Sequence, residues 1–321
     1  MHRRTLLTAA IAAWPLATRS QGSYPNKPIR LIVGFPPGGG IDFTARTLQS
    51  GLEAALGQSV VVEYKAGAGG VIAATELTRA APDGYTLLVA NTGPFAIAPY
   101  LQTKMPYDPV RQFSYIGQIT ESGYIAVTRA DHPAQDLKQF VAWARSNPGK
   151  ANFASGGPGT STHLNGELLN GVAGLDMLHV PYKGSAPAVT DLIAGQTHLL
   201  IDAGTVLLPH LKGGRLKALA VTGARRDANL PEVATAREQG FTGMEAAGFQ
   251  GLVGPAGMPR EIVERLAGEL RKVLANADIK AKFAAAGAEV NARGAPEFAA
   301  YVKAESERWA ALIAKRGLKL D

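Results

Sequence analysis

The sequence predicts an α/β protein with two lobes. Its 321 residues exceed what one typical domain needs, and strand-like and helix-like segments alternate along the chain. The order of apolar strand, glycine-rich loop and helix also occurs twice, at residues 31–48 and at residues 152–168. One such unit in each half of the chain indicates two similar α/β lobes.

The first half of the chain has the strand and helix order of a doubly wound sheet. Its first strand is apolar and ends at Pro36-Pro37, and the helix that follows has its apolar residues on one face. This helix stops at Gly57, a residue type common at helix ends. The expected elements are strands at 29–35, 60–62 and 86–90, a helix from Asp42 to about residue 56, and a second helix that ends near residue 81.

The second half continues this alternation before the chain returns to the first lobe. Expected strands lie at 116–119, 125–127, 151–154, 198–201 and 216–221, and expected helices lie near 137–147, 164–172 and 186–194. Beyond Gly248, Pro259 is expected in the first turn of a helix, and a last helix covers about 296–315. We expect a signal peptide at 1–20, a first lobe of residues 21–122 plus 246–321, and a second lobe of residues 123–245.

The first twenty residues have the pattern of an export signal. A basic start at Arg3-Arg4 precedes an apolar stretch from Thr5 to Ala17, which is too short to span a bilayer. Thr18 and Ser20 place small residues at positions −3 and −1 of a cleavage site before Gln21. The paired arginines fit a twin-arginine signal and an ordinary secretory (Sec) signal equally, so export by either route is expected.

Composition excludes several classes of function. The chain has no cysteine, which excludes zinc–thiolate sites, disulfides, cysteine nucleophiles and lipoprotein anchors. The formal net charge of +7 includes three arginines in the first twenty residues, which leaves an excess of +4 for the remainder. No run of Lys and Arg is interleaved with aromatic residues, so nucleic acid is not expected as a partner. A mild positive excess suits a small anionic ligand.

The two glycine-rich loops have the chemistry of anion sites. A helix start leaves backbone N–H groups unpaired and carries a partial positive charge, and glycines let an anion approach the main chain closely. Each contact to a carboxylate is a charge-assisted hydrogen bond worth about 1.5–3 kcal/mol. Two such loops facing each other would hold a carboxylate from both sides without a metal. The alternative is that both loops are only tight turns between strand and helix.

Motifs of enzymes and cofactors fail on spacing. The dinucleotide pattern Gly-x-Gly-x-x-Gly breaks because Phe43, Ile72 and Thr162 stand in the place of its last glycine. Gly149-Lys150 is followed by alanine, so there is no P-loop, and no Gly-x-Ser-x-Gly supplies an esterase nucleophile. The six histidines show no metal-ligand spacing. We expect no cofactor, no metal and no catalysis, with an enzyme assembled from distant residues as an alternative.

Three further residues each have two interpretations. His163, just past the second loop, either faces a ligand or packs locally, and local packing is favoured. Asp202 follows a predicted strand, where cleft residues of open sheets lie, and either orients a ligand amine or hydroxyl or forms a turn or cap. Lys183 either pairs with an anion or is solvated, and solvation is favoured.

Nine short segments, in order along the chain, resemble one family. They are Tyr24–Arg30, Phe35–Asp42, Ala81–Leu87, Met105–Pro109, Gly159–Leu164, Val180–Gly184, Asp191–Gln196, Leu219–Gly223 and Gly254–Pro259. Together they resemble the periplasmic receptors of tripartite tricarboxylate transporters, the Bug-type solute-binding proteins. The resemblance implies an α/β fold like that of type II periplasmic binding proteins, with two lobes around a ligand cleft.

The resemblance also implies a site. In that family both glycine-rich loops hold a ligand carboxylate through main-chain amides and bridging waters, together with the loop after the third strand and an acidic position. The matching residues here are Gly38, Gly39, Gly40, Ile41, Asp42, Asn91, Thr92, Ser155, Gly156, Gly157, Gly159, Thr160 and Asp202. Phe95 stands where relatives have an Asn-rich segment, and we expect it to make the pocket more apolar, against a citrate-like ligand.

The function implied is that of a monomeric periplasmic receptor. Its ligand would be a small carboxylate: a di- or tricarboxylate, an acidic amino acid or an aromatic acid. Its partners would be the membrane permease subunits of a tripartite transporter. A ligand-sensing subunit for a signalling partner is the alternative from another functional class.

Overall fold

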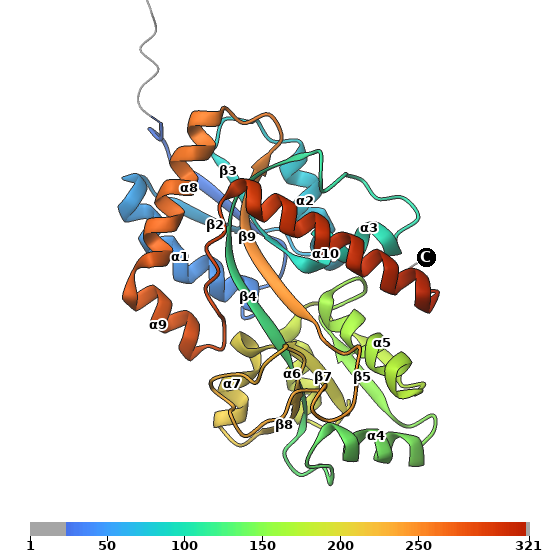
Figure 1. Ribbon diagram of the computed structural model, residues 1–321. Helices are drawn as coiled ribbons and strands as arrows, with labels where there is room; N and C mark the ends of the chain where they lie inside the picture. The colour runs from blue at the N-terminus through green and yellow to red at the C-terminus, as the bar shows by residue number, and fades with distance from the viewer. Residues whose placement is uncertain (1–23, 319–321) are drawn as a thin grey trace, which may run out of the picture.

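The computed structural model describes residues 24–318, and the expected signal peptide at 1–20 lies outside this range. Nine strands form one curled sheet in the order β2-β1-β3-β9-β4-β7-β5-β6, and β8 pairs with β4. The sheet runs from an upper group of elements to a lower group, with β4 and β9 passing between them (Figure 1). We call these groups the first and second lobes.

The first lobe begins with parallel strands. Its elements are β1 (Ile29–Val33), α1 (Gly40–Leu56), β2 (Val60–Tyr64), η1 (Ala68–Gly70), α2 (Val71–Thr78), β3 (Thr86–Asn91), η2 (Gly93–Ile97) and α3 (Ala98–Leu101). β1 pairs in parallel with both β2 and β3. The apolar face of α1 is buried against this sheet, and Gly57 ends the helix in the left-handed conformation, as predicted.

One long strand connects the lobes. β4 (Phe113–Arg129) is antiparallel to β9 (Ala247–Pro255) through Gly123, and from Tyr124 it pairs with β7 and β8. The prediction of two strands at 116–119 and 125–127 was wrong. Antiparallel partners follow the whole strand, so the chain stays extended through Gly117 and Gly123.

The second lobe has helices on both faces of its sheet. Its elements are α4 (Leu137–Ser146), β5 (Asn152–Ser155), α5 (Ser161–Ala173), β6 (Leu178–Pro181), α6 (Ser185–Ile193), β7 (Leu199–Ala203), α7 (Gly204–Lys212) and β8 (Leu216–Val221). Apolar residues of α4 and α5 pack on one face, and those of α6 and α7 pack on the other. β6 and α7 were not predicted.

The C-terminal helices return to the first lobe. They are α8 (Arg260–Ala275), α9 (Ala277–Ala285) and α10 (Ala295–Arg316). α8 and α9 share a core with α1, while α10 packs on β4 and η2. Pro259 is the N-cap of α8, not a first-turn residue, because its ψ of 138° is extended. Across residues 24–318, no helix combines the length and apolarity needed to cross a membrane.

Candidate functional site

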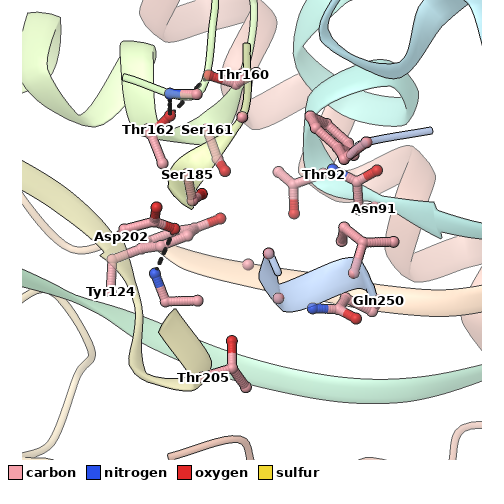
Figure 2. Close-up of a pocket in the computed structure, with 18 of the residues that line it drawn as sticks. Asn91, Thr92, Tyr124, Thr160, Ser161, Thr162, Ser185, Asp202, Thr205 and Gln250 are labelled. Atoms are coloured by element: carbon pink, nitrogen blue, oxygen red, sulfur yellow. Dashed lines mark hydrogen bonds between the residues drawn. The ribbon is translucent and has the colours of Figure 1, made fainter. Parts of the chain in front are cut away.

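A cavity of about 100 Å³ lies between the lobes, where several strands end and helices begin. Its wall includes residues of both glycine-rich loops, of β4 and of β9 (Figure 2). This volume is well below the few hundred Å³ of sites for drug-sized ligands, so it suits a small molecule.

Four helices begin at the wall of this cavity. Gly40 starts α1, Ser161 starts α5, Ser185 starts α6, and Thr205 is the second residue of α7. Each helix start contributes partial positive charge and N–H groups without partners inside the helix. The cavity is therefore electrostatically suited to an anion.

The first glycine-rich loop leaves its helix-start amides free to bind. Gly39 is the N-cap of α1, in an extended conformation and without a side-chain cap. The Gly38 N–H donates to Asp42 Oδ2 (2.9 Å), and Arg46 and the Tyr64 hydroxyl donate to Oδ1 (2.7 and 2.6 Å). Burial opposes ionisation, but these three donors hold the pKa of Asp42 below its usual range. Asp42 thus fixes the loop, and Gly40 and Ile41, the first two residues of α1, line the cavity.

The second glycine-rich loop uses most of its amides internally. The N–H groups of Gly156, Gly157 and Gly159 donate to Thr162 Oγ1 (2.8 Å), Ser155 Oγ (3.1 Å) and His163 Nδ1 (3.4 Å). Thr160 caps α5, with its hydroxyl accepting from the His163 N–H at 3.3 Å. The two loops are therefore not equivalent, because the second presents mainly the start of α5 to the cavity.

A serine and a histidine meet behind the second loop. Ser155 Oγ lies 2.6 Å from His179 Nε2, and the His179 ring stacks on His163 with centroids 4.0 Å apart. Burial lowers the pKa of His163 to about 3, with His179 adding to the effect, and lowers that of His179 to about 4. Ser155 is fully buried and does not line the cavity. The pair supports the loop, and His163 packs locally, as favoured from the sequence.

Asp202 lines the cavity and is almost fully buried. Its Oδ1 accepts from the Ala203 N–H (2.7 Å), whereas Oδ2 is shielded from solvent and has no hydrogen-bond partner within residues 24–318. Burial raises the pKa of Asp202 to about 6, and the nearby Ser185 hydroxyl and the Ala203 amide oppose that rise. Nearby, burial raises the pKa of Tyr124 to about 12, so its phenol is neutral.

The structure places the residues nominated from the sequence in two groups. Those that line the cavity are Gly39, Gly40, Ile41, Asn91, Thr92, Gly156, Thr160 and Asp202. Those that do not line it are Gly38, Asp42, Ser155, Gly157 and Gly159. The exposed Lys183 also lines the cavity. The expectation for Phe95 was wrong: its ring is fully buried against Tyr107 and Phe113, because η2 turns it into the core.

Several polar lining residues were not nominated from the sequence. They are Thr120, Ser122, Tyr124, Ser161, Thr162, Ser185, Thr205 and Gln250. For Ser185 and Thr205 a signal was present: each follows a strand and a glycine at the start of a helix, as Gly40 does. Tyr124 and Gln250 lie on strands that cross between the lobes, where local sequence carries no such mark.

The lobes are in contact around the cavity. A Cβ at Gly69, in the first lobe, would lie 2.8 Å from the carbonyl oxygen of Pro158, in the second. A Cβ at Gly184 would lie 3.2 Å from Cδ of Pro36. The glycine run at 67–70, which fails the dinucleotide spacing, therefore packs against the second glycine-rich loop.

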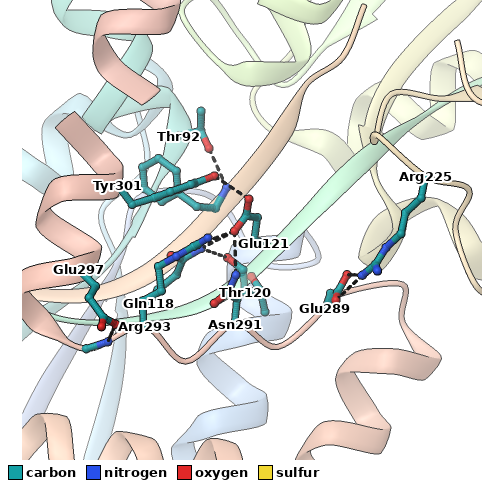
Figure 3. A network of polar contacts seen from close by, with 12 residues as sticks. Thr92, Gln118, Thr120, Glu121, Arg225, Glu289, Asn291, Arg293, Glu297 and Tyr301 are labelled. Atoms are coloured by element: carbon teal, nitrogen blue, oxygen red, sulfur yellow. Dashed lines mark hydrogen bonds and ion pairs between the residues drawn. The ribbon is translucent and has the colours of Figure 1, made fainter. Parts of the chain in front are cut away.

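A polar network secures the C-terminal segment beside the crossing strands (Figure 3). Glu121 of β4 pairs with Arg293 and accepts hydrogen bonds from Asn291 (2.8 Å) and the Tyr301 hydroxyl (3.0 Å). Thr92 Oγ1 accepts from the Phe249 N–H at 2.9 Å, which connects the end of β3 to β9. The network fixes α10 to β4, and both β4 and β9 contribute residues to the cavity wall.

Comparison with known proteins decides the family. The family model described as tripartite tricarboxylate transporter family receptor matches residues 44–318. The chain belongs to this receptor family. The resemblance seen in the sequence is thus confirmed.

Relatives match this receptor over nearly its whole length. The "UPF0065 protein in tcbD-tcbE intergenic region" of Pseudomonas sp. strain P51 is 39% identical, covering 100% of this chain and 96% of its own. The solved periplasmic binding protein BugD is 35% identical with a TM-score of 0.89, covering 92% of this chain and 99% of its own. The predicted α/β fold, with two lobes around a cleft, is that of the periplasmic binding proteins.

Two similar structures hold ligands. MatC from Rhodopseudomonas palustris, with bound malate, is 32% identical with a TM-score of 0.87, covering 90% of this receptor and 100% of its own chain. An R. palustris protein with adipate is 30% identical with a TM-score of 0.89, covering 92% and 99%. Both ligands are small carboxylates.

Proposed function

We propose that this receptor captures a small carboxylate between its lobes and delivers it to the permease subunits of a tripartite transporter. The single observation that carries the proposal is the convergence of four helix starts on one small cavity. The malate and adipate bound by similar proteins support the same ligand class.

In this proposal the two lobes contribute different kinds of hydrogen-bond donor to the carboxylate. The amides of Gly40 and Ile41 would donate to one carboxylate directly, because Asp42 and Gly38 already fix their loop. From the second lobe, the Ser161 and Ser185 hydroxyls and the starts of α5 and α6 would complete the contacts. Thr160 and Gly156 would act chiefly by shaping the wall.

We further propose that the two lobes are residues 21–122 with 246–321 and residues 123–245. The change of partners along β4 between Gly123 and Tyr124 supports a hinge there, since closure of two-lobed proteins needs only a few residues to rotate. A monomer suffices for this motion.

Catalysis is not part of the proposal. Neither Ser155 nor His179 lines the cavity, and the family and its solved relatives are binding proteins. Export to the periplasm with removal of residues 1–20 completes the proposed function. Mass spectrometry of the periplasmic protein should then give a chain that begins at Gln21, and recovery of the uncleaved chain in the cytoplasm would contradict export.

Thermal unfolding with a panel of carboxylates tests ligand capture. A carboxylate at 100 times its dissociation constant should add about 2.7 kcal/mol of stability, while the corresponding amide should add little. Equal shifts from acids and amides would contradict an anion site. Recovery of the bound carboxylate chemically unchanged would support a receptor, and steady product formation would contradict it.

A further inference from the structure

We infer that Tyr64, a residue outside the cavity wall, raises ligand affinity by fixing the carboxylate of Asp42 and, through it, the first glycine-rich loop. The inference rests on the proposed function, because it assigns a positioning role in the capture of a carboxylate. It adds a residue that does not line the cavity and that lies more than twenty residues beyond the loop in the sequence.

The pairing of β1 with β2 brings Tyr64 to the loop. Tyr64 is the last residue of β2, and the parallel register places it opposite Val33, the last residue of β1, from which the chain continues into the loop. The Lys65 N–H donates to the Val33 carbonyl oxygen at 2.9 Å, so the ends of the two strands are fixed side by side. The half-buried Tyr64 ring packs on the core that these strands share with α1. Its phenol therefore reaches the start of α1 from a well-supported position.

The Tyr64 hydroxyl belongs to a set of hydrogen bonds around Asp42. It donates to Asp42 Oδ1 at 2.6 Å and accepts from the Arg46 guanidinium at 2.6 Å, and Arg46 Nε donates to the same Oδ1 at 2.7 Å. The second oxygen, Oδ2, accepts from the Gly38 N–H at 2.9 Å. Asp42 is 6% exposed, whereas the Arg46 side chain is 58% exposed, and an exposed ion pair is weakened by solvent. Tyr64 is therefore the better shielded of the two donors to Oδ1.

The orientation of the Asp42 carboxylate decides whether the loop is held. The terminal torsion of an aspartate has a broad preference, so the side chain alone does not fix where its second oxygen points. Two donors on Oδ1 restrict this torsion and direct Oδ2 to the Gly38 N–H. Gly38 lies between β1 and α1 with a φ of +90°, a conformation that glycine adopts readily, and the bond to Asp42 connects it to the helix.

A loop that is already held binds a ligand more tightly than a loop that the ligand must order. Gly39, Gly40 and Ile41, which follow Gly38 directly, line the cavity. If these residues moved in the free receptor, ordering them would reduce the free energy of binding. The Tyr64 hydroxyl thus raises affinity without contacting the ligand.

Isothermal titration calorimetry of Tyr64→Phe tests the inference. The probe is malate, succinate or adipate, whichever the wild type binds most tightly. Phenylalanine keeps the ring in the core and removes only the hydroxyl, so the fold should persist while affinity falls about fivefold or more. Hydrogen exchange of the Gly38 amide should become faster in the same variant. Tyr85→Phe is the matched control, because the Tyr85 hydroxyl donates to Asn26 and neither residue lines the cavity, so affinity should not change.

A double-mutant cycle distinguishes positioning through Asp42 from a purely structural role of Tyr64. In Asp42→Asn, which lacks the charged acceptor, adding Tyr64→Phe should change affinity by less than about twofold. A structural role that does not involve Asp42 would instead lower affinity equally in both backgrounds.

The outcomes separate this inference from the proposed function. If the wild type binds none of the three acids, the proposed capture is contradicted and this inference falls with it. Three results would leave capture intact and overturn the role of Tyr64: wild-type affinity in Tyr64→Phe, an equal effect in both backgrounds, or unchanged exchange at Gly38.

Discussion

Gly40 of the first lobe packs against the hydroxyl of Thr205 in the second lobe. A Cβ at Gly40 would lie 2.7 Å from Thr205 Oγ1, closer than two such atoms can approach without movement. The starts of α1 and α7 can therefore approach each other as closely as they do only because residue 40 has no side chain.

Gly40→Ala should hold the lobes apart without harming the fold. Gly40 is a helical residue without a positive φ, so alanine is compatible with its backbone and favours the helix. Ligand affinity should fall about tenfold or more, because the loops of the two lobes no longer reach one ligand. Calorimetry measures the affinity, and small-angle scattering should show less compaction with ligand than in the wild type.

Two variants serve as controls for this substitution. Gly268→Ala, on α8, places its Cβ in open space and should leave affinity and compaction unchanged. Gly40→Ala combined with Thr205→Ala should restore compaction, since the opposing hydroxyl is gone. If Gly40→Ala alone had the affinity and compaction of the wild type, the Thr205 side chain would be shown to move aside at little cost.

Asp202→Asn should stabilise the ligand-free protein at neutral pH. Burial raises the pKa of Asp202 from 3.8 to about 6, so between these values the folded chain keeps a proton that the unfolded chain has lost. The stability contributed by this group is complete below about pH 4 and is lost as pH rises through 6. The loss at pH 7 is on the order of 3 kcal/mol, and asparagine avoids it because it does not ionise.

Urea unfolding of both proteins from pH 4 to pH 8 checks this prediction. The variant should be more stable than wild type by about 1–3 kcal/mol at pH 7, and the difference should vanish near pH 4. A difference that does not depend on pH would mean that ionisation of Asp202 is not its source.

Much of the fold could be predicted because its signals are local. The helix at 260–275 has an apolar stripe at Leu266, Leu270 and Val273, and all three side chains are buried. β6 and α7 escaped prediction for equally local reasons. β6 is a half-exposed strand of four residues with a proline, and α7 contains Pro209, which usually argues against a helix.

The site could be predicted only in part. Loops at 38–42 and 155–160 were found from glycines, but local sequence does not show which amides are already used, and in the second loop Thr162 and Ser155 use them. Tyr124 and Gln250 reach the cavity through the long antiparallel pairing of β4 and β9. Such pairing depends on contacts more than a hundred residues apart, which no local pattern reports.

Glu289→Gln should weaken ligand binding modestly and only at low salt. Arg225, in the second lobe, forms a two-fold contact to both carboxylate oxygens of Glu289 (2.5 and 2.7 Å), which belongs to the C-terminal segment of the first lobe (Figure 3). The side chains are 79% and 63% exposed, so the pair is screened and favours the closed lobes only slightly. Affinity should drop about two- to fivefold at 20 mM salt.

A matched ion pair provides the control. Arg260 and Glu264 are similarly exposed but lie within α8, so Glu264→Gln should not alter affinity at any salt concentration. The effect of Glu289→Gln should disappear at about 0.5 M salt, where screening is strong. Identical behaviour of the two variants would exclude a role for the Arg225–Glu289 pair in closure.

Acid should loosen the second glycine-rich loop through His163 and His179. Burial lowers their pKa values from 6.5 to about 3 and about 4, so the stability they contribute is present above pH 6.5 and is lost as pH falls toward 4. Protonation would also charge the ring that meets Ser155 and remove the Nδ1 acceptor of the Gly159 N–H. The protection factors of the amides at 156–160, which are corrected for the pH dependence of intrinsic exchange, should therefore fall between pH 6.5 and pH 4.5.

The measurement needs a background in which Asp202 does not titrate, because Asp202 gains stability over the same pH range in which the histidines lose it. In Asp202→Asn, stability should fall as pH drops below 6.5, and adding His179→Gln should flatten that fall. His210→Gln, on α7, should leave exchange in the loop unchanged although burial lowers the pKa of His210 too. If the loop keeps its protection at pH 4.5, or if His179→Gln leaves the acid response as it was, the histidine pair does not hold this loop in place.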